Sequence, residues 1–258
     1  MTPAELPGPI AAQIAAAVEH YVPHRAEFYN LAERVEKDLI QNEALKKHIH
    51  STKFREKDPV HLRDKLERQA IEALEKHKAF VITPDNLFKR VHDLAGVRLL
   101  HINREQLQLI DPIIREILRF YKYKFRGRPK AYTWDAENQA FYKQLGFRVE
   151  TNPSFYTSVH YVVQPHYDAV GCEIQVRTLA EELWGEVSHT VNYPHKTKSV
   201  ACAEQLKVLA RAASGCTRLV DSIFASLDEF NAMDAALQDA LKKLPPGAPP
   251  PQPKQPPK

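Results

Sequence analysis

Three polar side chains alternate with apolar ones in the stretch CEIQVRT. Glu173, Gln175 and Arg177 are each two residues apart. Because successive side chains of a β-strand point to opposite faces, a strand would place these three on one face and Ile174 and Val176 on the other. A carboxylate, an amide and a guanidinium in one row could position a phosphorylated substrate, since guanidinium groups bind phosphate through paired hydrogen bonds.

Two carboxylates lie at the starts of apolar strands. Asp93 lies in VHDLAGVRLL just before an apolar run, and Glu173 begins another. Carboxylates at the ends of neighbouring strands could together hold Mg²⁺, which prefers oxygen ligands and commonly binds substrate phosphates as well. The spacing alone agrees equally well with two unrelated surface acids.

Basic side chains gather in the stretch KFREKDPVHLRDK, which includes Arg55, Lys57 and Lys65. A run of charges by itself is typical of a solvated face. Two further arginines, Arg98 and Arg177, lie on expected strands, where a cation is costly without a partner. Strand arginines that converge with acids indicate a phosphate site.

The stretch FYTSVHYVV adds an aromatic residue. Tyr156, Ser158 and His160 alternate and should share one strand face. A tyrosine among phosphate-binding groups could stack on a nucleobase. A half-buried tyrosine packed in a sheet explains the pattern equally well.

Hydrophobic spacing and turn residues divide the chain into helices and strands that alternate. We expect helices at residues 10–22, 25–49, 60–80, 84–92, 104–121, 136–145, 178–192 and 200–243. Strands are expected at VRLLHI, FRVET, FYTSVHYVVQ and GCEIQVRT and within FYKYKFRGRPKAYTW, whereas HSTKFREKDPVH should be a polar connection. This order predicts an α/β (α+β) domain with a mixed sheet of about five strands flanked by helices.

Composition and length fit a globular domain with a substantial core. The 258 residues are 43% hydrophobic and 26% charged, and the formal net charge of +4 suits polyanionic ligands without requiring them. The three cysteines lack metal-binding spacing. Neither a signal peptide, nor an apolar run long enough to cross a membrane, nor a glycine-rich phosphate loop is evident. We therefore expect a cytoplasmic protein without membrane contact.

Four regions are expected along the chain. A helical extension (residues 1–49) precedes the sheet domain (50–195), a long helix follows (196–244), and a proline-rich tail (245–258) should be disordered. Apolar residues recur in the long helix in steps of three and four, at Leu206, Leu209, Ala213, Cys216, Val220, Ile223, Leu227 and Phe230. This seam fits packing on the N-terminal helices of the same chain or, alternatively, a homo-oligomer interface.

Four motifs together carry a resemblance: FREKDPVHLRDKL, VHDLAGVRLL, FYTSVHYVV and EIQVRTLAEELWGEVSHTVNY. In these motifs, over roughly residues 50–195, the chain resembles the RelA/SpoT synthetases and, among them, the small stand-alone alarmone synthetases. The resemblance implies a nucleotidyltransferase-like fold and a GTP diphosphokinase. Such an enzyme transfers the β,γ-pyrophosphate of ATP to the 3′-hydroxyl of GDP or GTP, uses Mg²⁺, and makes the alarmone (p)ppGpp of the stringent response.

The resemblance also implies roles for single residues. Asp93 resembles the family's Mg²⁺-binding aspartate, and Glu173 resembles a glutamate that assists the metal or activates the acceptor hydroxyl. The residues similar to those that bind ATP are Arg55, Lys57, Lys65 and Arg98. The residues expected on the acceptor side are Tyr156, His160, Gln175, Arg177 and Lys130.

The chain departs from the family pattern, mainly on the acceptor side. Ser154 and Phe155 replace the usual Asn-Gly before the stacking tyrosine, and His61 replaces a usual serine. The acceptor loop, usually short and basic, is here the longer KFRGRPKAYTWDAENQAFYKQLGF.

These departures leave other acceptors open. One alternative is the 3′ end of tRNA, as in toxic members of the family, which would imply an antitoxin as partner. Basic side chains suited to an RNA backbone are Lys122, Lys124, Arg126, Arg128 and Lys130. Another alternative is an adenine nucleotide, giving (p)ppApp. A binding module without activity is the non-enzymatic alternative, and the presence of both Asp93 and Glu173 argues against it.

Overall fold

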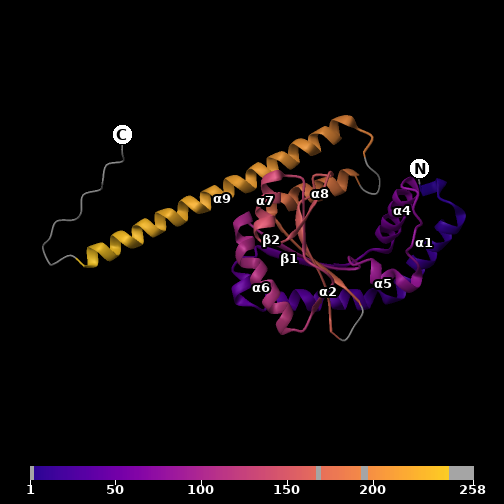
Figure 1. Cartoon of the computed structure of the whole chain (residues 1–258), viewed down its shortest axis with the longest axis horizontal. Coiled ribbons are helices and arrows are strands. Elements are labelled where there is room, and N and C mark those ends of the chain that lie inside the picture. Colours follow the sequence, from indigo (N-terminus) through magenta and orange to yellow (C-terminus); the bar gives the residue numbers. More distant parts are fainter. Residues whose placement is uncertain (1–2, 167–169, 193–196, 244–258) are drawn as a thin grey trace.

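The computed structural model describes residues 3–166, 170–192 and 197–243, and it contains a mixed sheet between two layers of helices (Figure 1). The strands are β1 (Ser51–Glu56), β2 (Ala95–His101), β3 (Lys124–Phe125), β4 (Lys130–Thr133), β5 (Arg148–Thr151), β6 (Ser158–Gln164) and β7 (Cys172–Thr178). The longer helices are α1 (Gly8–Tyr21), α2 (Arg25–Ile40), α4 (Pro59–Glu75), α6 (Leu107–Phe120), α7 (Ala136–Gln144), α8 (Leu179–Asn192) and α9 (Val200–Lys242). The short helical segments are η1 (Pro3–Glu5), η2 (Val22–His24), α3 (Glu43–Lys46), η3 (Pro84–Asn86), α5 (Leu87–Arg90) and η4 (Arg104–Gln106).

The prediction of an α/β fold is confirmed, but the described sheet has seven strands rather than about five. Their order is β1-β2-β7-β6-β4-β5, and β3 pairs with β6 outside this row. Strands β2 and β7 are parallel neighbours, and their register places Gly96 opposite Glu173 and Arg98 opposite Gln175. The sheet thus brings two motifs that are distant in sequence into contact.

The expected polar connection before residue 57 was wrong, because it contains the edge strand β1. Its antiparallel register with β2 places Lys53 opposite Arg98 and Arg55 opposite Gly96. An edge strand with charged side chains on its open face lacks the apolar run by which strands are recognised. The strand adds two cations to the polar face of the sheet.

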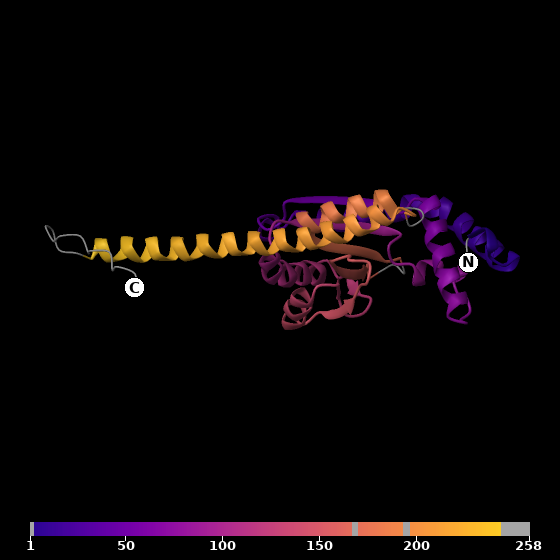
Figure 2. The same ribbon diagram turned by 90° about the horizontal axis from the view of Figure 1, so that it is seen from above.

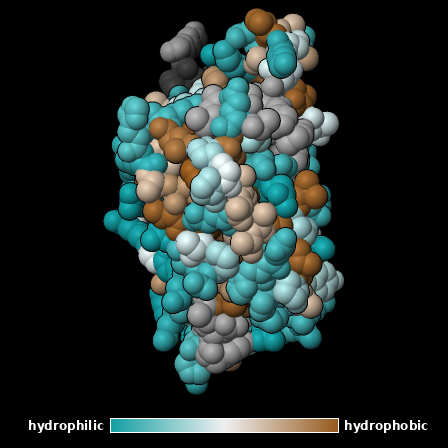
Figure 3. All heavy atoms as spheres, turned by 90° about the vertical axis from the view of Figure 1, so that its right-hand side faces the viewer, coloured by the Kyte–Doolittle hydropathy of each residue, from teal (hydrophilic) through white to brown (hydrophobic). Residues whose placement is uncertain are grey.

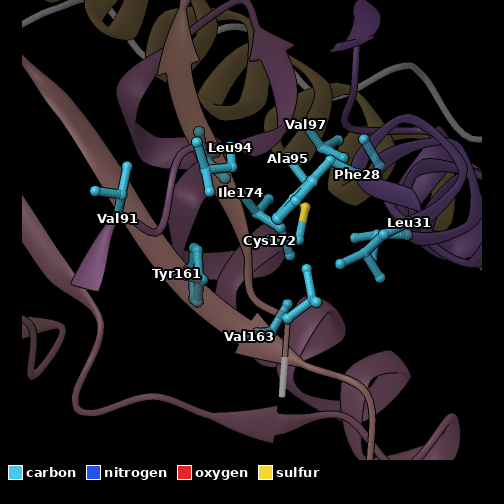
Figure 4. Packing of buried hydrophobic residues seen from close by; sticks show 14 of the residues in the cluster. Phe28, Leu31, Val91, Leu94, Ala95, Val97, Tyr161, Val163, Cys172 and Ile174 are labelled. Carbon is cyan, nitrogen blue, oxygen red and sulfur yellow. The ribbon is translucent and has the colours of Figure 1, made fainter. Parts of the chain in front are cut away.

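The apolar core lies on the other face of the sheet, under α2 (Figure 4). Phe28 and Leu31 of α2 belong to the same buried cluster as Val97 of β2 and Ile174 of β7. Ile174 and Val176 are both almost fully buried, so the alternation predicted for β7 is confirmed. Its polar side chains therefore face the opposite side, toward α8.

Helix α8 begins directly after β7 with reciprocal capping. The carboxylate of Glu181 accepts the N–H of Thr178, and the N–H of Glu181 donates to the Thr178 hydroxyl, which satisfies backbone groups that a helix start leaves unpaired. Further along, the Trp184 indole is buried and donates to the carbonyl of Leu206 at 2.9 Å. This bond joins α8 to α9.

The long helix α9 packs on the body through its N-terminal half only. Leu206, Ala210 and Ala213 are buried, and α9 contacts α8 and η4. The expectation that its seam packs on the N-terminal helices was therefore wrong, because α8 occupies that position. The C-terminal half projects away from the body (Figures 1 and 2).

The end of the molecule opposite the projecting half of α9 has a mostly hydrophilic surface with scattered apolar residues (Figure 3). No described helix is both long and apolar enough to span a membrane.

Candidate active site

The polar face of the sheet opens into a cavity of about 550 Å³ beside β1, β2 and β7. Its walls contain both candidate carboxylates, Asp93 and Glu173. The cationic and amide side chains that line it are Lys53, Arg55, Arg98 and Gln175. The sequence motifs around Asp93 and Glu173 thus converge on one cavity.

Asp93 lies in the loop before β2, between two lysines. Its two carboxylate oxygens accept hydrogen bonds from Lys57 at 2.7 Å and Lys65 at 2.6 Å. Burial alone would raise the pKa of the Asp93 carboxyl, but the charges of Lys65 and Lys57 outweigh it and hold the pKa well below its usual value. Asp93 is therefore ionised at neutral pH.

Lys57 is buried enough that its own pKa is lowered, mainly because burial disfavours the ammonium. The nearby Lys65 adds repulsion, while Asp93 stabilises the charge. Removal of Asp93 would leave two lysines without their shared counter-ion.

Glu173 is held by two polar side chains, His160 and Gln175, on neighbouring positions of the sheet. One carboxylate oxygen lies 3.3 Å from His160 Nδ1, and the other accepts from the amide of Gln175 at 2.7 Å. Burial alone would raise the pKa of Glu173, but the charge of His160 outweighs it and lowers the pKa to about 2. Tyr156 in turn lies 2.9 Å from His160 Nε2 through its hydroxyl.

His160 has the complementary shift. Burial would lower its pKa, but Glu173 and then Tyr156 stabilise the imidazolium and raise the pKa to about 10. A protonated imidazole donates from both nitrogens, so His160 bridges Glu173 and Tyr156. The expected shared strand face was only partly right, because β6 begins at Ser158 and Tyr156 reaches His160 from the preceding loop.

The strand arginines find their partners on α8. Arg98 donates to Glu182 and Glu186, each at 2.6 Å, and Arg177 pairs with Glu182. These two glutamates did not emerge from the sequence as site residues. The sequence feature that could have identified them is their separation by one helical turn, directly after the strand that carries Arg177.

A second cavity of about 390 Å³ adjoins the first. Both are lined by Arg55, Arg98, Gln175 and Glu186. The second cavity is also lined by Tyr156, Arg177, Arg68, Asn152 and His189, among others. Of the predicted ATP-side and acceptor-side residues, those that line one or both of these cavities are Arg55, Arg98, Tyr156, Gln175 and Arg177.

Lys130 lies apart from both cavities. It is opposite His160 in the β4–β6 register, but its ammonium pairs with Glu150 of β5 at 2.9 Å. Tyr132, on the same strand, packs its ring 4.8 Å from the His160 ring. The structure thus places an unanticipated tyrosine, rather than Lys130, against the acceptor-side histidine.

The turn before Tyr156 has a backbone conformation that suits glycine. Phe155 has a φ of 67°, in the left-handed region that a residue with a side chain adopts at a cost. Its ring lies 5.0 Å from the ring of Trp134, which offsets part of that cost. The Phe155 position therefore has a backbone conformation that glycine would adopt without strain.

Two carboxylates facing a cavity fit a magnesium site. Within the described ranges, no group of three His, Cys, Asp or Glu side chains is placed to hold a metal ion by itself. Mg²⁺ is commonly held by one or two carboxylates together with substrate phosphates. Asp93 and Glu173 fit that donor set, and bound phosphates could take over the lysines that now contact Asp93.

Comparison with known proteins agrees with this geometry. The family model described as "Region found in RelA / SpoT proteins" matches residues 54–198, which is more than half of the chain. The chain belongs to the RelA/SpoT family. No curated protein gave a match.

Several solved structures of small members of the RelA/SpoT family share its fold. The small alarmone synthetase 1 of Bacillus subtilis has a TM-score of 0.56 and 18% identity, over 81% of this chain and 96% of that chain. The structure of the same enzyme bound to its product pppGpp has a TM-score of 0.55 and 19% identity, with the same coverage of both chains. A GTP pyrophosphokinase family protein from Streptococcus pneumoniae has a TM-score of 0.52 and 18% identity, over 84% of this chain and 95% of that chain. At these identities the likeness establishes the fold.

Proposed function

We propose that this protein transfers the β,γ-pyrophosphate of ATP to the 3′-hydroxyl of GDP or GTP and so makes (p)ppGpp. The observation that carries the proposal is the pair of cavities that share four lining residues, with Asp93 and Glu173 in the wall of the larger one. Transfer between two nucleotides needs two adjoining compartments and a cluster of charge where they meet. Structural relatives include a small alarmone synthetase bound to pppGpp.

The cations are arranged to stabilise the transferred group. Attack at the β-phosphorus increases negative charge on the phosphoryl oxygens, and fixed cations stabilise that charge without reorganisation. We assign Arg55, Lys57, Lys65 and Arg98 to the ATP side. Mg²⁺ held by Asp93 and Glu173 would supply a further positive charge at these oxygens.

Glu173 is suited to orientation more than to proton removal. A carboxylate with a pKa of about 2 is a weak proton acceptor, whereas an efficient general base has a pKa near the working pH. We therefore assign Glu173 to holding the metal and aligning the 3′-hydroxyl. His160 keeps it ionised, and Tyr156, Gln175 and Arg177 form the wall against which the acceptor lies.

The contacts of the basic acceptor segment favour a nucleotide over tRNA. Arg126 donates to Gln164, Arg128 to the carbonyl of Gly146, and Lys130 pairs with Glu150. Three of the five cations that could follow an RNA backbone therefore serve contacts within the chain. The tRNA and adenine-nucleotide acceptors are retained as arms of the test.

The test incubates the full chain with γ-labelled ATP and Mg²⁺, and separately with GDP, GTP, ATP or deacylated tRNA. We expect label on GDP and GTP, and a loss of about 10²–10⁴-fold in rate for Asp93→Asn and Glu173→Gln. Label found on tRNA alone, or on the adenine nucleotide alone, would refute the guanine assignment. Equal activity of the two variants and the wild type would refute the site.

A further inference from the structure

A carboxamide side chain lies in the wall of the second cavity, on the turn that leads into Tyr156. It belongs to Asn152, which lines this cavity together with Ser154 and Tyr156. Asn152 is half-buried and was not among the residues expected in the site. Its hydrogen bonds decide what it offers to a ligand.

The turn engages most of the polar groups of Asn152. Its backbone N–H donates to the carbonyl of Thr133 at 3.0 Å, and its own carbonyl accepts the N–H of Phe155 at 3.4 Å. Its side-chain oxygen Oδ1 accepts two hydrogen bonds from Ser154, one from the backbone N–H at 2.9 Å and one from the hydroxyl at 2.6 Å. A side-chain oxygen bonded to the backbone N–H two residues ahead forms an Asx turn, which fixes the orientation of the carboxamide.

The amide nitrogen Nδ2 of Asn152 is left for a ligand. Among the described residues, no hydrogen-bond partner is found for it. A carboxamide oxygen has two lone pairs, and the two donors of Ser154 occupy both of them. Asn152 therefore offers the second cavity hydrogen-bond donors and no free acceptor.

Purine bases differ at the edge that such a donor contacts. Guanine has two acceptors there, O6 and N7, whereas adenine has the acceptor N7 and the amino donor N6. An asparagine recognises adenine by using its oxygen and its nitrogen together. Asn152 cannot do so, because its oxygen is already bonded within the turn. Its amide instead matches guanine O6 and opposes the N6 amino group.

We propose that Asn152 selects a 6-oxopurine as the base of the acceptor nucleotide. The assignment rests on the proposed pyrophosphate transfer, since it needs the acceptor base to stack on Tyr156 in the second cavity. The Arg177 guanidinium, 5.6 Å from the centroid of the Tyr156 ring, supports that ring. Stacking stabilises any base, because every base has a π-face. The Asn152 amide then discriminates between the bases.

A series of acceptors tests which edge of the base is recognised. The full wild-type chain is assayed with γ-labelled ATP and Mg²⁺ against GDP, IDP, ADP and 2,6-diaminopurine riboside 5′-diphosphate. IDP lacks the 2-amino group of guanine but keeps O6, whereas the diaminopurine keeps the 2-amino group and has an amino group in place of O6. We expect kcat/KM for IDP within about threefold of GDP, and values for ADP and the diaminopurine at least about tenfold lower.

Asn152→Asp tests the residue, because aspartate forms the same Asx turn. The second oxygen of the aspartate accepts where Nδ2 donates. We therefore expect the GDP-to-ADP ratio of kcat/KM to fall by about tenfold or more.

Asn42→Asp is the matched control. Asn42 Oδ1 also accepts two hydrogen bonds, from the N–H groups of Ala44 and Leu45 at 3.0 Å each. Asn42 does not line the second cavity. The control adds the same charge and should leave the GDP-to-ADP ratio unchanged.

Three results would overturn the proposal. They are a GDP-to-ADP ratio that Asn152→Asp leaves unchanged, IDP used as poorly as ADP, and the diaminopurine used as well as GDP. The last two come from the wild type, so they decide the matter whatever the stability of the variant.

Transfer to no nucleotide would refute the proposed function instead. Titration calorimetry of GDP, IDP and ADP on the wild type and Asn152→Asp then tests the base assignment without any reaction. Tighter binding of GDP and IDP than of ADP, lost in the variant, would support Asn152, and equal binding of all three to the wild type would overturn it.

Discussion

The His160–Glu173 pair should make a large and pH-dependent contribution to stability. Its charged atoms lie 3.3 Å apart, and the two side chains are only 13% and 15% exposed. At that distance an effective dielectric constant of about 20 gives an attraction of roughly 5 kcal/mol. Lost hydration of both ions opposes it, so we expect a coupling free energy of about 2–4 kcal/mol.

The pH window follows from the two pKa shifts. The pKa of His160 rises from 6.5 to about 10 on folding, so its share of the stability is complete below pH 6.5 and is lost as the pH rises through 10. The pKa of Glu173 falls from 4.5 to about 2, so its share is complete above pH 4.5 and is lost as the pH falls through 2. The coupling should therefore be largest between pH 4.5 and 6.5 and smaller at pH 9.

A double-mutant cycle measures this coupling. Urea unfolding of the metal-free wild type, His160→Gln, Glu173→Gln and the double variant gives it at pH 5.5 and pH 9. The matched control cycle uses the exposed pair Lys207–Glu204, where we expect about 0.5 kcal/mol or less. A His160–Glu173 coupling below about 1 kcal/mol, or one equal at both pH values, would refute the assignment of a buried ion pair.

Two further substitutions test how the site is supported. Gly185→Ala places a Cβ atom 2.7 Å from the Arg177 guanidinium, so we expect a higher KM for the acceptor. In the control variant Gly215→Ala, the added Cβ meets nothing within 4 Å. This variant should stabilise the chain by about 0.5–1 kcal/mol in thermal unfolding. Equal KM values for the two variants would contradict this. Tyr21→Phe removes the 2.6 Å hydrogen bond from the Tyr21 hydroxyl to the carbonyl of Lys57. We expect the free energy of unfolding to fall by about 1 kcal/mol and kcat to decrease. An unchanged kcat would show that α1 does not position Lys57.

The elements that carry the site were predictable where the sequence has a clear period. The polar row of β7 followed from alternation, because its opposite face is uniformly apolar and buried. Helices α8 and α9 followed from hydrophobic spacing and turn residues. Strand β1 did not, because an edge strand that faces a charged cavity has no apolar run and depends on pairing with β2, a distant segment.

The ion-pair partners of the charged side chains were harder to predict from the sequence than the positions of the helices and strands. Arg98 and Arg177 were recognised as cations in need of a partner, but Glu182 and Glu186 are chosen by the docking of α8 on the sheet, which no local pattern encodes. Lys130 was predicted as a site residue, and its strand register does place it opposite His160. Its ammonium nevertheless pairs with Glu150 of the neighbouring strand. The left-handed backbone of Phe155 was not predicted, because a residue with a side chain rarely adopts it.

The α8 glutamates have a consequence for substrate binding. Arg98 is neutralised by Glu182 and Glu186, and Arg177 by Glu182. A phosphate group must therefore exchange with a carboxylate that is already well placed, and breaking a buried pair is costly unless a stronger partner replaces it. A polyphosphate offers more charge and more acceptor oxygens than a monophosphate. In the proposed reaction, such an exchange would favour di- and triphosphates over the released AMP and would help AMP to leave.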